Sequence, residues 1–259
     1  MTVRPTSPQK VDVWTLWIPD HAAAAADSAW ILGAEESARA DGFQDPTARE
    51  RYVASHVGLR VLLGGYLGMA PQDVEFFREP CGMPDCEEPH GRPAIAGHPQ
   101  PCFSLSHAGD AALYAVADSP VGADIESAKL MRDSLDRAAR RLHIEERRAV
   151  AALSPTLRHR AVLGCWVRKE AYLKGIGTGL PGGVGRHHVG LAEELAPDGA
   201  PPGPMGWSIA NVPAPDGYQA AIAVRDQNAT ADGPHLLVRV SPLRLPQGRV
   251  GPLPVPRIH

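Results

Sequence analysis

The order of the predicted helices and strands constrains the fold of this chain more than any single motif does. Alternating apolar residues predict a strand at 11–17, and composition and helical spacing predict helices at 22–40 and 46–67. The further predicted elements are strands at 74–78, 103–106, 111–117 and 121–126, helices at 145–153 and 156–174, and a hairpin of strands at 206–212 and 218–224. Strand, helices and then strands therefore occur twice in succession. This repetition indicates an α+β fold built from two similar halves.

Proline and glycine mark the segments between and after these elements. Residues 79–100 and 196–206 are rich in both and are expected to be loops. Residues 241–259 contain further prolines without an apolar period, which predicts a segment that crosses the surface or stays mobile. We therefore divide the chain into an N-terminal half, 1–118, a C-terminal half, 119–226, and a Pro-rich tail, 227–259.

The composition excludes several classes of protein. The chain has 259 residues, of which 44% are hydrophobic and 21% charged, as is typical of a globular protein. Its formal net charge of −3 gives no broad basic surface for nucleic acid or an anionic membrane, so phosphate must be bound by a local basic cluster. No apolar run approaches the roughly 20 residues of a membrane-spanning helix, and residues 1–10 have no signal-peptide core. We expect a cytoplasmic protein.

The four cysteines do not form the dense pattern of a disulfide framework in a chain of this length. Cys81 and Cys86, followed by His90, are a candidate zinc clip. The remaining ligands of such a clip are missing from the local sequence, and loop cysteines without a full ligand set are usually plain thiols. The sequence does not decide between these alternatives.

Two short motifs carry acidic and basic side chains whose spacing places them on one face. Asp124 and Glu126 are two residues apart in a predicted strand, so both side chains point to the same side. Trp166, Glu170 and Lys174 recur every four residues along one stripe of a predicted helix. Separately, each motif is explained by solvated surface charges and a buried tryptophan. If the two elements meet, three carboxylates and an ammonium form a site for a divalent cation and a phosphate.

Ser106 and His107 lie at the end of a predicted strand upstream of the acidic pair, where they can donate hydrogen bonds to phosphate oxygens. Alone, they are more simply explained as a turn serine beside an exposed histidine. They do not form a nucleophile pair, because adjacent residues on a strand point apart. Arg92, in a Gly-Arg-Pro turn, is a further basic candidate. The glycine-rich stretch at 175–179 follows a helix instead of preceding one, so it is not a phosphate-binding loop.

These motifs occur in one order: Gly-Arg-Pro, Phe-Ser-Leu-Ser-His, Gly-Ala-Asp-Ile-Glu and Trp-Val-Arg-Lys-Glu-Ala-Tyr-Leu-Lys. In this order the chain, from about Trp14 to about Val224, resembles the 4′-phosphopantetheinyl transferase superfamily, specifically its larger, single-chain, pseudo-dimeric (surfactin-synthetase-activating) type. The resemblance implies transfer of the phosphopantetheine arm of coenzyme A to a serine of an apo acyl or peptidyl carrier protein, with release of adenosine 3′,5′-bisphosphate. It also implies a monomer of two similar halves, each a small antiparallel sheet packed on a long helix, with the ligand cleft between them.

The resemblance further implies which residues hold the metal and carry out the transfer. It places Mg²⁺, or alternatively Mn²⁺, on the carboxylates of Asp124, Glu126 and Glu170. Glu170 matches the residue that takes the proton from the attacking serine, directly or through water. Lys174 matches the lysine that contacts the pyrophosphate.

Coenzyme A contacts are implied for a second group of residues. Those that match residues around its phosphates and adenine are Arg51, Arg92, Ser106 and His107, with His107 at the 3′-phosphate. The chain departs from the pattern at Glu36, where some members carry a lysine near that phosphate, although Arg39 one turn later keeps a basic group.

Two other functions remain open from the sequence. A metal-dependent hydrolase would use the same site with water in place of serine, and would release bisphosphate without a carrier protein. A catalytically silent module would bind coenzyme A or a carrier protein without turnover, and the retained acidic and basic set argues against it. For the carrier protein itself we expect a small, partly hydrophobic docking surface beside the cleft.

Overall fold

The computed structural model describes residues 8–81, 91–179, 183–195, 203–227 and 236–246. The candidate zinc clip falls mostly outside these residues, because Cys86 and His90 are not among them, whereas Cys81 is buried. Within the described parts of the chain, none of the helices is both long and apolar enough to cross a membrane.

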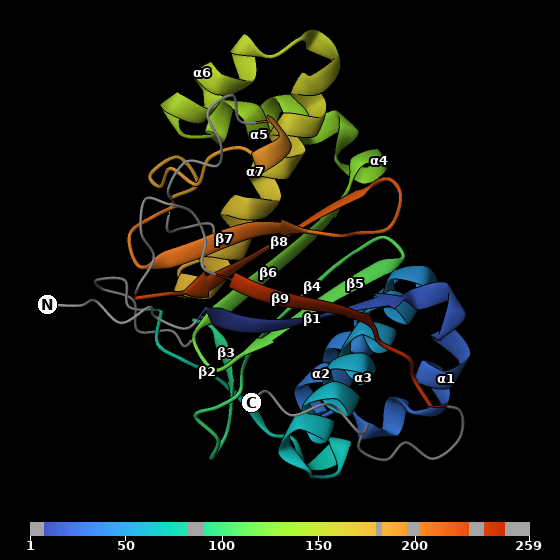
Figure 1. Ribbon diagram of the computed structural model, residues 1–259. Helices are drawn as coiled ribbons and strands as arrows, with labels where there is room; N and C mark the ends of the chain where they lie inside the picture. Colours follow the sequence, from blue (N-terminus) through green and yellow to red (C-terminus); the bar gives the residue numbers. More distant parts are fainter. Residues whose placement is uncertain (1–7, 82–90, 180–182, 196–202, 228–235, 247–259) are drawn as a thin grey trace, which may run out of the picture.

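The first half contains a long helix and most of a four-stranded sheet (Figure 1). Its elements are β1 (Gln9–Trp17), α1 (Ala22–Asp27), α2 (Ala34–Asp41), α3 (Pro46–Leu67), β2 (Phe76–Arg78), β3 (Pro93–Ile95), β4 (Cys102–Ala108) and β5 (Ala111–Ala117). The sheet has the strand order β4-β5-β1-β9, in which β5 is antiparallel to both neighbours. The short strands β2 and β3 pair separately.

The second half repeats this arrangement. Its elements are β6 (Val121–Ser127), α4 (Ala128–Met131), α5 (Leu135–Arg141), α6 (Ile144–Ala152), α7 (Pro155–Ile176), β7 (Trp207–Val212) and β8 (Tyr218–Arg225). The three strands form an antiparallel sheet of order β6-β8-β7. In the first half, β1 precedes the long helix and pairs with β5, and β5 pairs with β4. In the second half, β6 precedes the long helix and pairs with β8, and β8 pairs with β7. The prediction of an α+β fold with small antiparallel sheets and long helices is confirmed. The shared strand order agrees with the expected pseudo-dimeric arrangement of two halves, which stays a prediction.

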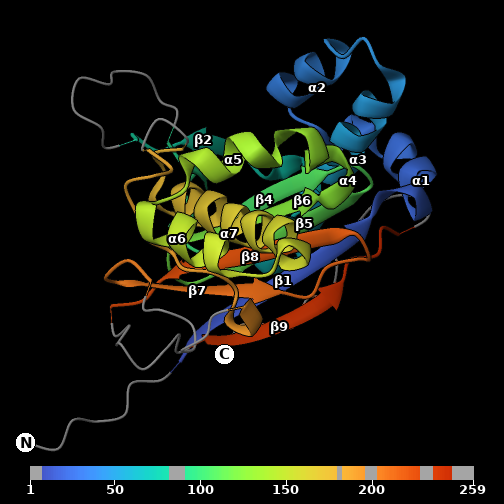
Figure 2. The same ribbon diagram turned by 90° about the horizontal axis from the view of Figure 1, so that it is seen from above.

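The two sheets pack against each other and the long helices cover their outer faces, as Figures 1 and 2 show. Strand β5 is buried on both sides: Tyr114 and Val116 join the core around α3, whereas Leu113 and Ala115 join the core between the sheets. Strand β8 alternates in the same way between the inter-sheet core and the core under α7. The continuous apolar runs of these two strands follow from burial on both faces.

The long helices α3 and α7 each have 22 residues and similar ends. Both begin at a proline, whose fixed backbone angle suits the first helical turn. Both end at a glycine in the left-handed region, Gly68 and Gly177, as helices commonly do. The prediction for 46–67 is confirmed, and that for 156–174 is confirmed to within two residues.

The expected helix at 22–40 is wrong as a single element. The chain forms α1 and α2 instead, separated by a short 3-10 turn at Ala29–Ile31 and by Gly33. Glu36 accepts a hydrogen bond from the Gly33 amide and so caps the start of α2. Alanine content predicted helix correctly, but it gave no indication of this new start.

The prediction of a tail over 227–259 is wrong for residues 236–246. Strand β9 (Leu236–Pro242) pairs in parallel with β1, and Arg239 lies 2.7 Å from the buried carboxylate of Asp12. Leu243 and Leu245 then enter the core around α3. The apolar, β-branched character of this stretch favours a strand, but the prolines on either side concealed it.

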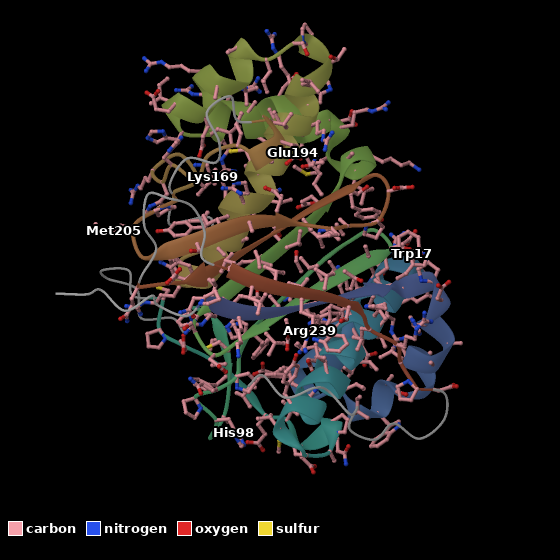
Figure 3. All side chains as sticks on the ribbon, in the orientation of Figure 1. Trp17, His98, Lys169, Glu194, Met205 and Arg239 are labelled. Carbon is pink, nitrogen blue, oxygen red and sulfur yellow. The ribbon has the colours of Figure 1, made fainter. Side chains whose placement is uncertain are left out.

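A buried ion pair fixes the second half around α7. The side chains of Lys169 and Glu146 are 1% and 0% exposed and lie 2.7 Å apart; Figure 3 marks Lys169 among the side chains packed around α7. Glu146 also accepts hydrogen bonds from the amides of His143 and Val189, and Lys169 donates to the carbonyl of His187. One pair therefore connects α6, α7 and the segment that follows α7.

Candidate active site

The close approach of β6 to α7 builds the site. Gly122 makes it possible, because a Cβ atom at this position would collide with the carbonyl oxygen of Ala171. Asp124 and Glu126 follow on β6, and Glu170 and Lys174 lie on the turns of α7 that face them. The two motifs that were separate in the sequence therefore meet.

A hydrogen-bonded network joins three elements at the centre of the site. The Lys174 ammonium lies 2.6 Å from Oδ1 of Asp124 and 2.9 Å from Oγ of Ser106. Ser106, on β4, also donates to Oδ1 of Asp124 at 2.9 Å. Residues of the first sheet, the second sheet and α7 thus share one set of contacts, and the network spans both halves.

These residues line a cavity of about 470 Å³. The predicted residues in its wall are Ser106, His107, Asp124, Glu126, Trp166, Glu170 and Lys174. Residues that the sequence analysis did not identify complete the wall: Met131, Ser134, Arg137, Ala138 and Arg141. The latter come from α4, α5 and the turn between them, so the second half supplies most of the cavity.

The carboxylates of the cavity are crowded and poorly solvated. Burial, and then the charge of Asp124, raise the pKa of Glu126 to about 7, against the opposing effect of Lys174. The same two causes raise the pKa of Glu170 to about 7. Burial also raises the pKa of Asp124, although Lys174 and Ser106 favour its charged form. Such a group of acids is stabilised in its ionised form by added positive charge.

Several basic side chains act on His107, which also lines the cavity. Desolvation of its ring, and then the neighbouring basic groups His56, Lys174, Arg39 and Arg51, lower the pKa of His107 to about 4. The cationic charge comes from Lys174, Arg39 and Arg51, because desolvation lowers the pKa of His56 as well. The same arrangement attracts an anion such as phosphate.

The two predicted arginines do not line the cavity in the structure. Arg51 pairs with Asp110 at 2.6 Å. Arg92 pairs with Glu79 at 2.6 Å and donates to the carbonyl of Gly175, close to the end of α7. Arg51 contributes to the positive field at His107, whereas Arg92 supports the helix that carries Glu170 and Lys174.

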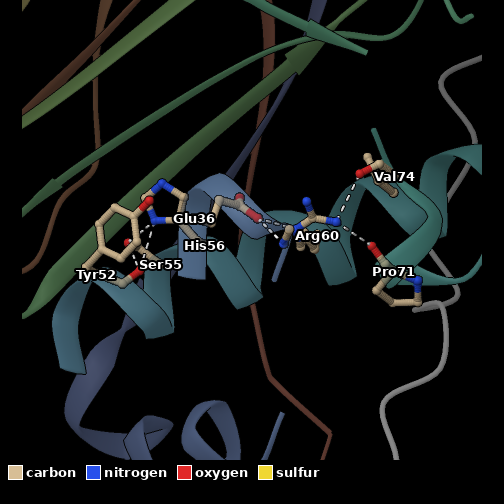
Figure 4. A network of polar contacts seen from close by, with 8 residues as sticks. Glu36, Tyr52, Ser55, His56, Arg60, Pro71 and Val74 are labelled. Atoms are coloured by element: carbon tan, nitrogen blue, oxygen red, sulfur yellow. Dashed lines mark hydrogen bonds and ion pairs between the residues drawn. The ribbon is translucent and has the colours of Figure 1, made fainter. Parts of the chain in front are cut away.

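The departure at Glu36 has a structural explanation (Figure 4). Glu36 lies 2.6 Å from Nε of Arg60, which is 5% exposed, and Arg60 also donates to the carbonyls of Pro71 and Val74. A lysine at position 36 would leave a buried guanidinium without its counter-charge. Glu36 therefore stabilises the start of α2 and its packing against α3, and it is not assigned to phosphate binding.

The cavity has the donor set of a hard divalent cation. Oδ2 of Asp124 is buried and has no hydrogen-bond partner among the described residues, and two further carboxylates line the same space. Within the described chain, no three His, Cys, Asp or Glu side chains are yet gathered closely enough to hold a metal. The ammonium of Lys174 occupies the other oxygen of Asp124, at 2.6 Å. The residues present fit Mg²⁺ or Mn²⁺ by chemistry.

The contribution of α5 had a signal in the sequence that was not used. Leu135, Ala138 and Leu142 recur at helical spacing and are buried against α7. Arg137 and Arg141 lie between them, and the Arg141 guanidinium is 5.9 Å from the centre of the Trp166 ring. A helix prediction at 135–141 would have placed two arginines on the face next to the α7 motif.

Comparisons with known proteins agree with this geometry. The family model described as the 4′-phosphopantetheinyl transferase superfamily matches residues 120–202. The chain is 31% identical over 173 residues to the 4′-phosphopantetheinyl transferase HetI of Nostoc sp., covering 66% of this chain and 70% of the relative. It is 28% identical over 152 residues to the 4′-phosphopantetheinyl transferase Sfp of Bacillus subtilis, covering 58% and 67%.

A third relative extends the match over more of the chain. It is the phosphopantetheinyl transferase of Thraustochytrium sp., 31% identical over 210 residues, or 72% of this chain and 68% of the relative. The matched family region contains β6 and α7, which carry Asp124, Glu126, Glu170 and Lys174. Motif order, site geometry and these relatives agree: the chain belongs to the 4′-phosphopantetheinyl transferase superfamily.

Proposed function

We propose that this enzyme transfers the 4′-phosphopantetheine arm of coenzyme A to a serine hydroxyl of an apo acyl or peptidyl carrier protein. The released product is adenosine 3′,5′-bisphosphate. The observation that carries the proposal is the network of Ser106, Asp124 and Lys174, which lies in one cavity with Glu126 and Glu170. Phosphoryl-type transfer requires carboxylates that hold a cation and positively charged side chains that contact the phosphates.

In the proposed step, the serine oxygen of the carrier protein attacks the phosphorus that bears the pantetheine arm. A new P–O bond forms, and the bond from that phosphorus to the oxygen bridging the two phosphates breaks. The serine proton passes to Glu170, directly or through water. Burial and the charge of Asp124 raise the pKa of Glu170 to about 7 when no cation is bound, and a bound cation would lower it, so this role rests on the position of the carboxylate in the cavity. Lys174 supplies a fixed positive charge beside the pyrophosphate.

Asp124, Glu126 and Glu170 would together hold Mg²⁺, with Mn²⁺ as the alternative. When bound, the cation neutralises charge on the two phosphates. The unpartnered Oδ2 of Asp124 and the raised pKa values of Glu126 and Glu170 support this proposal. Lys174 also contacts Ser106, which faces the same cavity from the first half.

We assign the positive cluster around His107 to the phosphates of coenzyme A, the 3′-phosphate in particular. Arg51 and Arg39 belong to this cluster through their charge at His107. Arg92 would act from a position outside the cavity lining, through its contact with the end of α7. The monomeric state and the cytoplasmic location remain predictions.

Replacing His107 with alanine should weaken coenzyme A binding by roughly tenfold, the value of one hydrogen bond to a charged group. The rate at saturating coenzyme A should change less, because the ring is assigned to recognition. Isothermal titration calorimetry and initial rates measure the two effects. His98→Ala is the matched control, since His98 is exposed and outside the cavity lining (Figure 3). Wild-type affinity in His107→Ala would remove this residue from the site.

Intact-mass spectrometry tests the proposed function directly. An apo carrier protein is incubated with this enzyme, coenzyme A and Mg²⁺, and a parallel sample contains EDTA. We expect a mass gain of one phosphopantetheine arm that is absent with EDTA. Release of bisphosphate without a carrier protein would instead identify a hydrolase. Binding of coenzyme A with no gain on several acyl and peptidyl carriers would identify a binding module.

A further inference from the structure

The turn between β4 and β5 contacts both halves of the enzyme. The Asp110 carboxylate accepts hydrogen bonds from Nε and Nη2 of Arg51, at 3.0 and 2.6 Å. The carbonyl of Asp110 accepts from the amide of Ile18 at 2.8 Å. The amide of Asp110 donates to the hydroxyl of Tyr218, on β8 of the second half, at 3.1 Å. One residue therefore joins α3, the 3-10 turn that follows β1, and β8.

The turn is shaped to fit against Tyr218. Gly109 has a φ of +52°, which favours glycine, and a Cβ atom there would lie 2.7 Å from the Tyr218 hydroxyl. The Tyr218 ring in turn packs edge-on against Trp17, with centroids 6.2 Å apart. Asp110 is thus held by contacts on its backbone, and its carboxylate has a fixed position from which to act on Arg51.

Arg51 is oriented by one edge of its guanidinium group. Asp110 takes the edge formed by Nε and Nη2, and among the described residues no acceptor bonds to Nη1. A guanidinium has five N–H donors in a rigid plane, so fixing one edge also fixes the direction of the other. The side chain is 32% exposed, and its charge reaches His107 at the cavity wall. The edge that remains is therefore available to an anion.

We propose that Asp110 is a positioning residue, which holds Arg51 so that its remaining N–H groups meet a phosphate of coenzyme A. Through Tyr218, the same residue ties this arginine to the half that carries Asp124 and Glu170. The proposal rests on the proposed function, since it takes coenzyme A as the ligand. It differs from a purely structural role in predicting that Asp110 affects coenzyme A only through Arg51.

A double-mutant cycle separates these roles. Coenzyme A binding is measured by calorimetry, without a carrier protein, for Asp110→Ala, Arg51→Ala and the double variant. We expect each single substitution to weaken binding on the order of tenfold, and the double variant to be no weaker than Arg51→Ala. If the two losses multiply, or if Asp110→Ala binds as tightly as or more tightly than the wild type, the proposal is overturned.

Two further measurements keep the outcome unambiguous. Asp110→Asn keeps a side-chain oxygen but loses the charge, so the affinity of this variant for coenzyme A should lie between those of the wild type and Asp110→Ala. If Asp110→Ala does not fold, the double-mutant cycle is repeated with Asp110→Asn. With a saturating carrier protein, the KM for coenzyme A should rise in the Asp110 variants while kcat stays within a few-fold. Wild-type affinity in Arg51→Ala would overturn this inference alone, since transfer to the carrier is tested independently by intact mass.

Discussion

Glu170→Gln is expected to lower the rate of transfer by about 10²–10⁴-fold while coenzyme A still binds. Glutamine has nearly the same shape, so the contacts of α7 remain, but it cannot accept the serine proton. Burial and the charge of Asp124 raise the pKa of Glu170, whereas a bound cation would lower it and keep the carboxylate ionised and able to accept a proton. Single-turnover rates with an apo carrier protein, together with calorimetry of coenzyme A binding, measure the two properties separately.

Glu126→Gln is the matched control for this prediction. It makes the same change of charge in the same cavity, and burial with the charge of Asp124 likewise raises the pKa of Glu126 to about 7. We expect its activity to recover as Mg²⁺ is increased, because this carboxylate is assigned to the cation alone. Glu170→Gln should remain impaired at every Mg²⁺ concentration. Glu170 would be excluded as the base if high Mg²⁺ fully restored the activity of Glu170→Gln. A near-normal rate of this variant without added Mg²⁺ would exclude it as well.

Lys169→Met is expected to lower the free energy of unfolding by about 3–5 kcal/mol. The side chain of Lys169 is 1% exposed and that of Glu146 is 0% exposed, so the substitution leaves a carboxylate buried without its counter-charge. The amides of His143 and Val189 would still donate to Glu146, which sets the expected loss toward the lower end of this range. Urea unfolding followed by circular dichroism measures the change.

Arg148→Met provides the comparison. Arg148 and Glu145 lie on α6 at the same 2.7 Å separation as the buried pair, but their side chains are 70% and 53% exposed. Solvent screening limits such a pair to less than about 1 kcal/mol. Similar losses in Lys169→Met and Arg148→Met would mean that burial does not determine the contribution of the Lys169–Glu146 pair. A Lys169→Met loss below about 1 kcal/mol would have the same meaning.

The sequence predicted those parts of the site whose geometry follows from local periodicity. Asp124 and Glu126 are on one side of a strand, and Glu170 and Lys174 on one stripe of a helix, and these spacings hold in the structure. The sequence did not predict whether this strand and this helix lie side by side. This arrangement depends on Gly122, whose lack of a side chain allows β6 to approach α7, and no periodicity reports such a contact.

The parts that could not be predicted depend on partners distant in the sequence. Arg51 matched a ligand-contacting position, but its pairing with Asp110 is a tertiary contact between α3 and a turn of the first sheet. Glu36 was noted as a departure, and the buried Arg60 that requires it is likewise far along the chain. The prolines on either side concealed strand β9, and its partner, β1, lies near the other end of the sequence, where no local pattern indicates the pairing.

Strand β9 also has a consequence for how the enzyme folds during synthesis. β1 is translated early, and β9, which pairs with it, only after the whole second half has been made. At about 5–20 residues per second, the β1 edge waits for roughly tens of seconds on the ribosome. During that time its open hydrogen-bonding groups and the apolar surface that Leu243 and Leu245 later cover are exposed to other chains. Recombinant yield should therefore depend on translation speed and chaperone supply more than the native contacts alone would indicate.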